Sequence, residues 1–184
     1  MRIEPTSIPG AFVVDLEPVV DDRGVFVRTF CAEDFESAGL VPAVAQCSLS
    51  SNPTRGTLRG MHFQQAPYGE AKLVRCSRGR IFDVAVDARS GSLTLGRWQA
   101  WELDARSYRS VFLPPGVAHG FLTLTDDAEV TYQMSASYRP DASAGFRWDD
   151  PAVGIAWPST PSLISDRDRH LPLLADAPFQ GVSA

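Results

Sequence analysis

Arg55-Gly56-Thr57-Leu58-Arg59-Gly60-Met61-His62-Phe63-Gln64 is the stretch around which the chain is organised, and Glu70-Ala71-Lys72-Leu73-Val74-Arg75 follows it closely. Together the two segments carry a histidine, arginines and the only lysine of the chain. Polar and apolar residues alternate loosely from Gly56 on, which is typical of a strand with one buried face. Strict alternation would separate Arg59 from His62. The two can share a cavity only if a bulge at Gly60 re-aims one of them.

Composition favours a single domain over residues 1–184, with its core over about residues 10–160 and a C-terminal tail over 161–184. The chain has 184 residues, 44% of them hydrophobic, which is enough for one real core. It shows neither an apolar run long enough to cross a membrane nor a signal-peptide pattern, so a cytoplasmic protein is expected. Three cysteines without CxxC spacing are expected to be reduced thiols.

The distribution of charge is more informative than its sum. A net charge of −5 argues against a nucleic-acid partner. Between Arg23 and Arg80, however, the chain has eight basic residues and four acidic ones, a local excess of four positive charges. This half of the chain is suited to hold a small anionic ligand.

Short segments rich in β-branched and aromatic residues predict an all-β fold with a few short helices. Breaks carrying Gly, Pro, Asp and Ser separate them at even spacing, which is typical of a sandwich or barrel. One helix is expected at residues 32–38, closed by Gly39. After Trp157-Pro158 we expect a loop with a short helical turn and frayed last residues. The expected strands cover residues 11–20, 25–30, 42–50, 56–64, 71–77, 80–87, 95–103, 109–113, 119–123, 128–134 and 136–139.

A metal site is the first chemistry to weigh, because a small β-barrel with histidines invites one. Such a site would need a His-x-His pair, a carboxylate soon after it and a further histidine. His62 is followed by Phe63-Gln64, and the other histidines, His119 and His170, lie far along the chain. Metal binding is therefore the minority interpretation, and neither a metal nor a cofactor is expected.

Seven motifs stand in register along the chain. They are Gly56-Thr57-Leu58-Arg59-Gly60-Met61-His62-Phe63-Gln64, Lys72-Leu73-Val74-Arg75, Phe82-Asp83-Val84-Ala85-Val86-Asp87, Pro115-Gly116-Val117-Ala118-His119-Gly120-Phe121, Trp148-Asp149-Asp150-Pro151, Trp157-Pro158 and Ser165-Asp166-Arg167-Asp168. The set resembles the dTDP-4-dehydrorhamnose 3,5-epimerase family, the RmlC-like cupins, across residues 10–170. One such motif would be weak evidence, whereas seven in order are strong.

The resemblance implies a metal-free, cupin-type jelly roll, a β-sandwich or barrel, in a homodimer. It implies an isomerase that inverts C3, C5 or both in a nucleotide-linked 4-keto-6-deoxyhexose, with dTDP as the nucleotide. Such enzymes serve the route to deoxysugars such as dTDP-L-rhamnose. The expected partners are the nucleotide-sugar substrate and a second copy of the chain, without nucleic acid or membrane.

The resemblance also implies four catalytic residues. His62 matches the base, since an imidazole can both accept and release a proton near neutral pH. Asp168 matches the aspartate that pairs with this histidine and stabilises the imidazolium. Tyr132 matches the proton donor on the opposite face, and Lys72 matches the cation beside the keto oxygen, where it favours the enolate.

Further positions match substrate-binding residues of the family. Arg23 and Arg59 match the residues that hold the diphosphate, a task suited to a forked guanidinium. Tyr138 matches the aromatic ring that stacks on the thymine. The other matches are Gln46 in the base region, Ser48 two places after it, His119 at the substrate and Arg167 in the motif of Asp168.

The four catalytic assignments and that of His119 have simpler alternatives, and the sequence departs from the family at two positions. His62 alone would be a packed or hydrogen-bonded strand histidine. Tyr132 alone would be a core residue, Lys72 and Asp168 solvated surface residues, and His119 a turn histidine. Arg28 stands where many members carry Glu, and Ser48 where they carry Asn, both near the nucleotide site. The alternatives are an epimerase acting at C3 only or C5 only in a secondary-metabolite pathway, a metal-dependent cupin, or a non-catalytic sugar-nucleotide binder.

Overall fold

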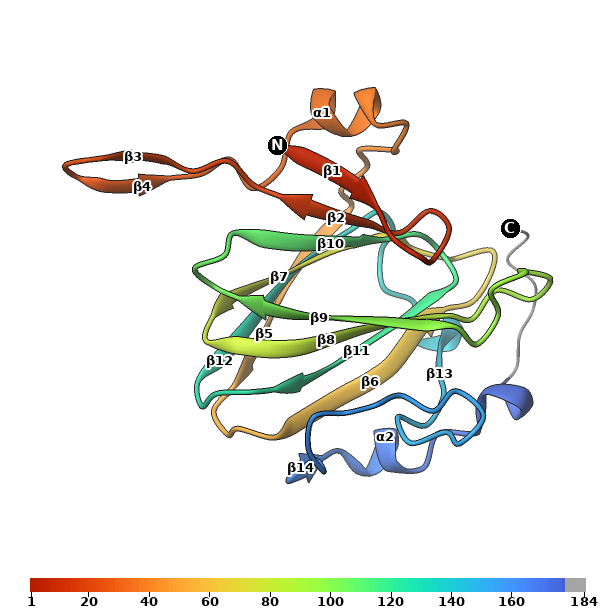
Figure 1. Ribbon diagram of the computed structural model, residues 1–184. Coiled ribbons are helices and arrows are strands. Elements are labelled where there is room, and N and C mark those ends of the chain that lie inside the picture. The colour runs from red at the N-terminus through yellow and green to blue at the C-terminus, as the bar shows by residue number, and fades with distance from the viewer. Residues whose placement is uncertain (178–184) are drawn as a thin grey trace.

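The computed structural model describes residues 1–177, which form two antiparallel β-sheets facing each other (Figure 1). Neighbouring strands within each sheet are mostly far apart in sequence, so the sheets assemble through long-range pairing rather than simple hairpins. The six-stranded sheet follows the order β1 (Arg2–Pro5), β2 (Phe12–Asp15), β10 (Arg109–Leu113), β7 (Lys72–Arg78), β12 (Ala128–Met134) and β5 (Gln46–Asn52). The second sheet follows the order β13 (Ser143–Gly145), β6 (Thr57–Gln64), β11 (Val117–Thr123), β8 (Arg80–Asp87) and β9 (Trp98–Asp104), with β14 (Leu163–Ile164) parallel to β6.

Four short helical segments complete the chain. They are α1 (Ala32–Ser37), α2 (Asp166–Arg169) and the 3-10 helices η1 (Pro140–Ala142) and η2 (Leu174–Asp176). Helix α1 ends where the sequence predicts, because Gly39 adopts a φ of +75° that only glycine reaches without strain. The all-β prediction with a few short helices is thereby confirmed. Over residues 1–177, no helix has the length and apolar character that crossing a bilayer requires.

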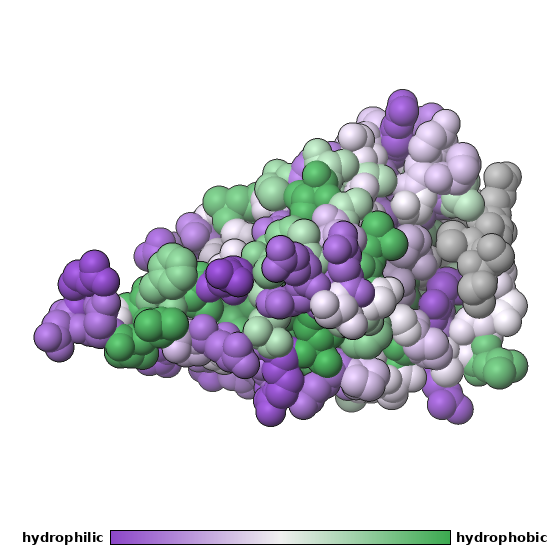
Figure 2. Space-filling model, turned by 90° about the horizontal axis from the view of Figure 1, so that it is seen from above, coloured by the Kyte–Doolittle hydropathy of each residue, from purple (hydrophilic) through white to green (hydrophobic). Residues whose placement is uncertain are grey.

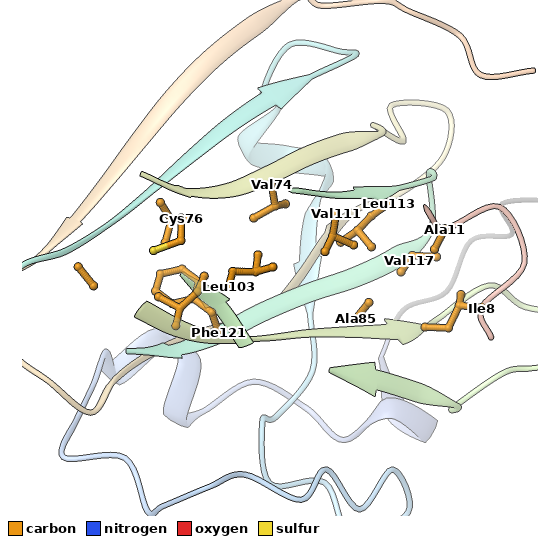
Figure 3. Packing of buried hydrophobic residues seen from close by; sticks show 13 residues of the cluster. Ile8, Ala11, Val74, Cys76, Ala85, Leu103, Val111, Leu113, Val117 and Phe121 are labelled. Atoms are coloured by element: carbon orange, nitrogen blue, oxygen red, sulfur yellow. The ribbon is translucent and has the colours of Figure 1, made fainter. Parts of the chain in front are cut away.

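The main core lies between the two sheets (Figure 3). Val74 and Val111 point into it from the six-stranded sheet, and Ala85, Leu103 and Phe121 meet them from the other. All five side chains are essentially inaccessible to solvent. Because side chains alternate along a strand, residues two places from core positions, such as Lys72, His119 and Tyr132, lie on the same inner faces and line the cavity described below.

Each sheet also has an outer face that other segments cover. Helix α1 places Phe35 over Leu73 and Phe112 on the six-stranded sheet. On the second sheet, the chain after residue 144 lays Phe146 and Leu174 over strands β6, β8 and β11. The segment expected to be a C-terminal tail therefore packs as a layer of the fold up to residue 177. The expected fraying of the last residues concerns 178–184, which lie outside the described residues.

Some strand predictions are wrong in position. The expected strand at residues 11–20 is split into β2 and β3 (Val19–Asp21), and the expected strand at 25–30 shrinks to β4 (Gly24–Phe26). Residues 136–139 form no strand, whereas β1 at the N-terminus pairs with β2 although the sequence pattern did not indicate it. The reason is that strand formation depends on an available sheet edge, which local composition does not report.

Strands β3 and β4 form a separate two-stranded hairpin that projects beyond the two sheets (Figure 1). Its side chains are unusually exposed for their type, with Val20 at 70% and Phe26 at 73%. Viewed from above, hydrophobic residues lie at the outer surface just behind a hydrophilic tip (Figure 2). The hairpin thus presents apolar surface that finds no cover within residues 1–177.

Strand β6 contains the irregularity that the sequence demands at Gly60. His62 pairs with His119, and Arg59 pairs with Phe121, so three steps along β6 match two along β11. One extra residue therefore stands in β6, which is the definition of a β-bulge. Gly60 adopts a φ of +133°, and a Cβ there would lie 2.5 Å from the Cα of Gly120. The predicted bulge is confirmed, and it turns Arg59 and His62 toward one cavity.

We expect Gly60→Ala to lower the free energy of unfolding by about 2–4 kcal/mol, because it combines unfavourable φ with a backbone clash. Urea denaturation followed by circular dichroism measures the loss. Gly91→Ala is the matched control, since Gly91 also has a positive φ, +84°, but has open space around its Cβ position. Equal losses for the two variants would contradict a steric role for Gly60.

Candidate active site

A cavity of about 430 Å³ opens beside the bulge of β6, between the two sheets. Its walls come from β5, β6, β7, β11 and β12, together with the segments around residues 138, 143 and 167. The lining residues are Ser48, Ser50, Arg59, His62, Phe63, Gln64, Glu70, Lys72, His119, Phe121, Tyr132, Met134, Tyr138, Ser143 and Arg167. The fold thus gathers side chains that are up to 119 positions apart in sequence around one space.

His62 lines the cavity and is held from behind by Asp168. Its Nε2 lies 2.7 Å from Asp168 Oδ1, while the second carboxylate oxygen accepts the backbone N–H of Gly60 at 3.1 Å. Ser165 caps α2 by accepting the N–H of Asp168. The His62 side chain is 36% exposed, whereas that of Asp168 is 6% exposed. The arrangement is an oriented imidazole that faces the cavity with a buried carboxylate behind it.

The charge of Asp168 is stabilised by its hydrogen bonds. Burial by itself would raise the pKa of this carboxyl, but the hydrogen bond and attraction of His62 and the N–H of Gly60 outweigh burial and hold its pKa below the usual range. Asp168 is therefore an anion at neutral pH. An anion in this position orients the imidazole and stabilises it when it becomes protonated.

A second histidine–carboxylate pair lies deeper. His119 Nε2 is 2.7 Å from Asp83 Oδ1, and both residues are buried. The ring of Tyr132 stands edge-on to that of His119, with centroids 5.8 Å apart. Burial raises the pKa of the Tyr132 phenol, and the negative charge of Asp83 raises it further. Tyr132 consequently keeps its proton at neutral pH and faces the cavity as a neutral donor.

Two arginines at the cavity are positioned by neutral groups. Arg59 donates from Nε to the side-chain oxygen of Asn52 at 2.8 Å, and Arg167 donates to the Ser143 hydroxyl at 2.7 Å. The Asn52 amide in turn donates to the carbonyl of Ala128, which fixes its orientation. Because neither partner is an anion, both guanidinium charges remain available to an anionic ligand.

Lys72 sits at the cavity in a buried ion pair with Glu70. Its ammonium lies 2.5 Å from the Glu70 carboxylate, and the two side chains are 10% and 6% exposed. Lys72 is the first residue of β7, and Glu70 precedes it in the connecting loop. The alternative of a solvated surface lysine is therefore wrong for Lys72.

Two glutamines hold the segment that carries Tyr138. Gln46 accepts the backbone N–H of Tyr138 at 2.8 Å. The buried Gln64 accepts the N–H of Arg139 and donates to the carbonyls of Tyr68 and Ser137. Gln46 thus acts on the backbone of Tyr138, whose ring lines the cavity and is 52% exposed overall.

The structure brings together all but one of the residues singled out in the sequence. His62, Tyr132 and Lys72 line the cavity with Ser48, Arg59, His119, Tyr138 and Arg167. Asp168 and Gln46 stand directly behind lining residues. Arg23 is the exception, because it lies at the tip of the β3–β4 hairpin with its side chain 90% exposed and paired with Asp21.

Sequence reasoning missed Asn52, Gln64, Glu70 and Asp83. Asp83 and Gln64 were inside recognised motifs, and Glu70 stood two places from a singled-out lysine, so proximity along the chain was an available signal. Asn52 is held by the carbonyl of Ala128, which is 76 positions away, and no local signal exists for such a contact. Within residues 1–177, no three His, Cys, Asp or Glu side chains converge in a way that could hold a metal ion.

The two facing sheets and the cavity between them define a cupin-type β-sandwich enzyme with an imidazole–carboxylate pair at its site. The family model described as dTDP-4-dehydrorhamnose 3,5-epimerase matches residues 5–176. The dTDP-4-dehydrorhamnose 3,5-epimerase of Methanothermobacter thermautotrophicus is 42% identical over 181 residues, 96% of each chain. The dTDP-4-dehydrorhamnose 3-epimerase of Streptomyces niveus is 40% identical, over 99% of this chain and 88% of its own.

A solved structure extends the similarity to three dimensions. It is a 4-keto-6-deoxy sugar epimerase from the novobiocin biosynthetic gene cluster of Streptomyces spheroides, with a TM-score of 0.90 and 42% identity. The match covers 95% of this chain and 88% of that one. The chain therefore belongs to the dTDP-4-dehydrorhamnose 3,5-epimerase family, and it is an isomerase.

We expect Asp168→Asn to destabilise the protein by about 1–3 kcal/mol at pH 7, because it removes a buried anion that accepts two hydrogen bonds. The folded-state pKa of Asp168 lies below its unfolded value of about 3.9. The ionised Asp168 carboxylate therefore contributes fully to the free energy of unfolding above about pH 5. This stabilisation is lost as the pH falls below about 4 and through the folded-state pKa. Urea unfolding from pH 3 to 7 measures the difference between variant and wild type.

Asp166→Asn is the control for this measurement, because Asp166 is exposed on the same helical turn. Its stability should follow that of the wild type at every pH. If the free energies of unfolding of Asp168→Asn and wild type differ by the same amount down to pH 3, the charge of Asp168 is not what stabilises the fold.

Proposed function

We propose that the protein epimerises a dTDP-linked 4-keto-6-deoxyhexose at C3, at C5 or at both, by proton transfer through an enolate. The observation that carries the proposal is that an imidazole backed by a carboxylate, His62 with Asp168, and a neutral phenol, Tyr132, line one cavity. Epimerisation next to a ketone needs a base on one face of the sugar and an acid on the other. Family membership supports the same substrate class.

The proton leaves carbon toward His62. Because Nε2 is engaged by Asp168, the proton goes to Nδ1, and the ring becomes an imidazolium that the buried carboxylate stabilises. The electron pair of the broken C–H bond forms a double bond between that carbon and C4, and the π pair of the C4 carbonyl moves to the oxygen, which becomes the enolate oxygen. Tyr132 then returns a proton to the opposite face of the carbon, which inverts the stereocentre. The raised pKa of its phenol keeps that proton in place until the enolate forms.

Lys72 is the group that stabilises the enolate oxygen. Its ammonium is placed at the cavity wall by the start of β7, and burial strengthens its electrostatic effect. A cation stabilises the enolate far more than the neutral ketone, so it lowers the barrier rather than only tightening substrate binding.

The nucleotide end of the substrate is assigned to the cationic part of the cavity. Arg59 and Arg167 form hydrogen bonds to neutral side chains and no ion pair among residues 1–177, which suits a diphosphate. Tyr138 offers a ring for stacking on the base. Ser48, at the same wall, lines the cavity where many family members carry Asn.

Epimerisation at C3 alone is the second candidate. The Streptomyces niveus relative is named a 3-epimerase, and it is about as similar to this chain as the relative named a 3,5-epimerase. Both reactions require the same base, acid and cation. The choice depends on whether the bound sugar presents its C3 hydrogen alone or both hydrogens to the base, and an exchange experiment distinguishes the outcomes.

We expect wild-type protein in deuterium oxide to exchange the C3 and C5 hydrogens of dTDP-4-keto-6-deoxyglucose, or one of them. His62→Asn should lower the exchange rate by about 1000-fold, because it removes the base. Nuclear magnetic resonance follows the exchange and assigns each position. His170→Asn is the matched control, since His170 is exposed and outside the cavity, and should exchange at the wild-type rate.

Three outcomes would contradict the proposal. If the wild-type protein exchanges neither the C3 nor the C5 hydrogen, it binds sugar nucleotides without turning them over. Exchange that His62→Asn retains would assign the base elsewhere. Exchange that disappears with a chelator and returns with metal would indicate a metal-dependent reaction.

We also propose that the active form is a homodimer in which the β3–β4 hairpin reaches the partner's cavity. The hairpin exposes Phe26 and carries Arg23 away from the cavity of its own chain. In addition, a depression of about 450 Å³ on the outer face of β5, β7 and β12 contains Arg75 Nε and Gln133 Oε1, which are buried without hydrogen-bond partners among residues 1–177. An unpaired donor and an unpaired acceptor on one face can satisfy each other across a two-fold axis.

The dimer proposal is tested by mixing two defective variants. Arg23→Ala should lower kcat/KM about 10-fold or more, because it removes a charged contact to the diphosphate. A mixture with His62→Asn, refolded together, should regain about a quarter of the wild-type sites, because each mixed dimer has one intact site. Activity that stays at the sum of the two separate variants would contradict a contribution of Arg23 across the interface.

A further inference from the structure

Glu70 is the acidic side chain that lies at the cavity without an assigned role. It belongs to the loop before β7, is 8% exposed, and lines the cavity with Lys72. Among residues 1–177 its charged partner is the Lys72 ammonium, 2.5 Å away. The other two carboxylates near the site, Asp168 and Asp83, are each accounted for by a histidine.

A carboxylate at this position is costly for an enzyme that takes an anionic substrate. Burial removes its hydration, and it opposes the negative charge of a diphosphate or an enolate. It also offsets the charge of the very ammonium that faces the ketone. We therefore expect the Glu70 carboxylate to have a compensating role, and its contact with Lys72 indicates that this role concerns the lysine ammonium.

Lysine needs a stronger anchor than the arginines of the cavity do. Its four-carbon stem is flexible and its ammonium is a compact, strongly hydrated charge that moves toward water when it can. Arg59 is anchored by an amide and Arg167 by a hydroxyl. A carboxylate is the strongest such anchor, and the ammonium keeps two further N–H donors for a second acceptor.

We propose that Glu70 is a positioning residue that fixes the Lys72 ammonium at the place where the enolate oxygen develops. The inference rests on the proposed function of Lys72 in epimerisation. With Glu70 in place, one donor of the ammonium is occupied and the remaining two point into the cavity from a defined point. Without it, the ammonium moves toward solvent at the cavity mouth, and the developing charge on C4 oxygen loses its nearest cation. The effect falls on the transition state rather than on binding of the nucleotide.

The test is a double-mutant cycle on kcat for exchange of dTDP-4-keto-6-deoxyglucose. Glu70→Gln keeps the size of the side chain and should lower kcat about 10- to 100-fold. Its KM and its affinity for dTDP, measured by calorimetry, should remain at wild-type values. In a Lys72→Met background, adding Glu70→Gln should produce no further loss, because Glu70 acts through Lys72.

Further variants keep the result decisive. Glu70→Asp retains the charge at a shorter reach and should recover part of the loss, which a purely structural role would not predict. Glu102→Gln is the matched control, since it breaks an exposed pair between Glu102 on β9 and Arg80 on β8 and should leave kcat unchanged. Losses that multiply in the double variant would overturn the inference, and a raised KM would make Glu70 a substrate contact. If wild-type protein exchanges nothing, the proposed function fails. If the wild-type protein exchanges the substrate hydrogens and the effects of the two substitutions on kcat are independent, only the proposed role of Glu70 is refuted.

Discussion

The carboxylate of Asp168 is the group on which the arrangement of the site depends. One of its oxygens holds His62 and the other accepts the N–H of Gly60, at the bulge that lets Arg59 and His62 face one cavity. Asp168 reaches this place because Ser165 caps the helical turn that carries it. A single buried anion thus joins the C-terminal layer, the irregular strand and the imidazole.

Pairing of each carboxylate with a nitrogen donor explains how so many ionisable groups coexist around a small cavity. The three carboxylates, Asp168, Asp83 and Glu70, are matched with His62, His119 and Lys72. A buried charge without a partner would be costly, so the pairs keep the site compatible with a stable fold. The arginines are treated differently, since amide and hydroxyl partners leave their positive charge for a ligand. The site therefore combines carboxylates that each have a hydrogen-bonded or ionic partner with cationic groups suited to a nucleotide diphosphate.

The inner and outer faces of the two sheets have different roles. Their inner faces form the apolar core, and the same strands β6, β7, β11 and β12 deliver polar side chains where the core gives way to the cavity. The outer face of the second sheet is covered by the chain after residue 144. Among residues 1–177, the outer face of the first is covered over the part beneath α1, and the projecting hairpin remains exposed. A second copy of the chain is the cover that we propose for both.

Local sequence determined the all-β class, the stop of α1 at Gly39 and the need for a bulge at Gly60, because these follow from side-chain periodicity and backbone sterics. The resemblance of seven motifs indicated the family and ten of the residues that line or support the cavity. Only tertiary structure decided that Arg23 stands away from its own cavity, that Glu70 pairs with Lys72, and that Asn52 and Gln64 orient the site. These contacts join segments far apart or separated by a turn. Their energies depend on burial and direction, which appear only once the sheets have packed.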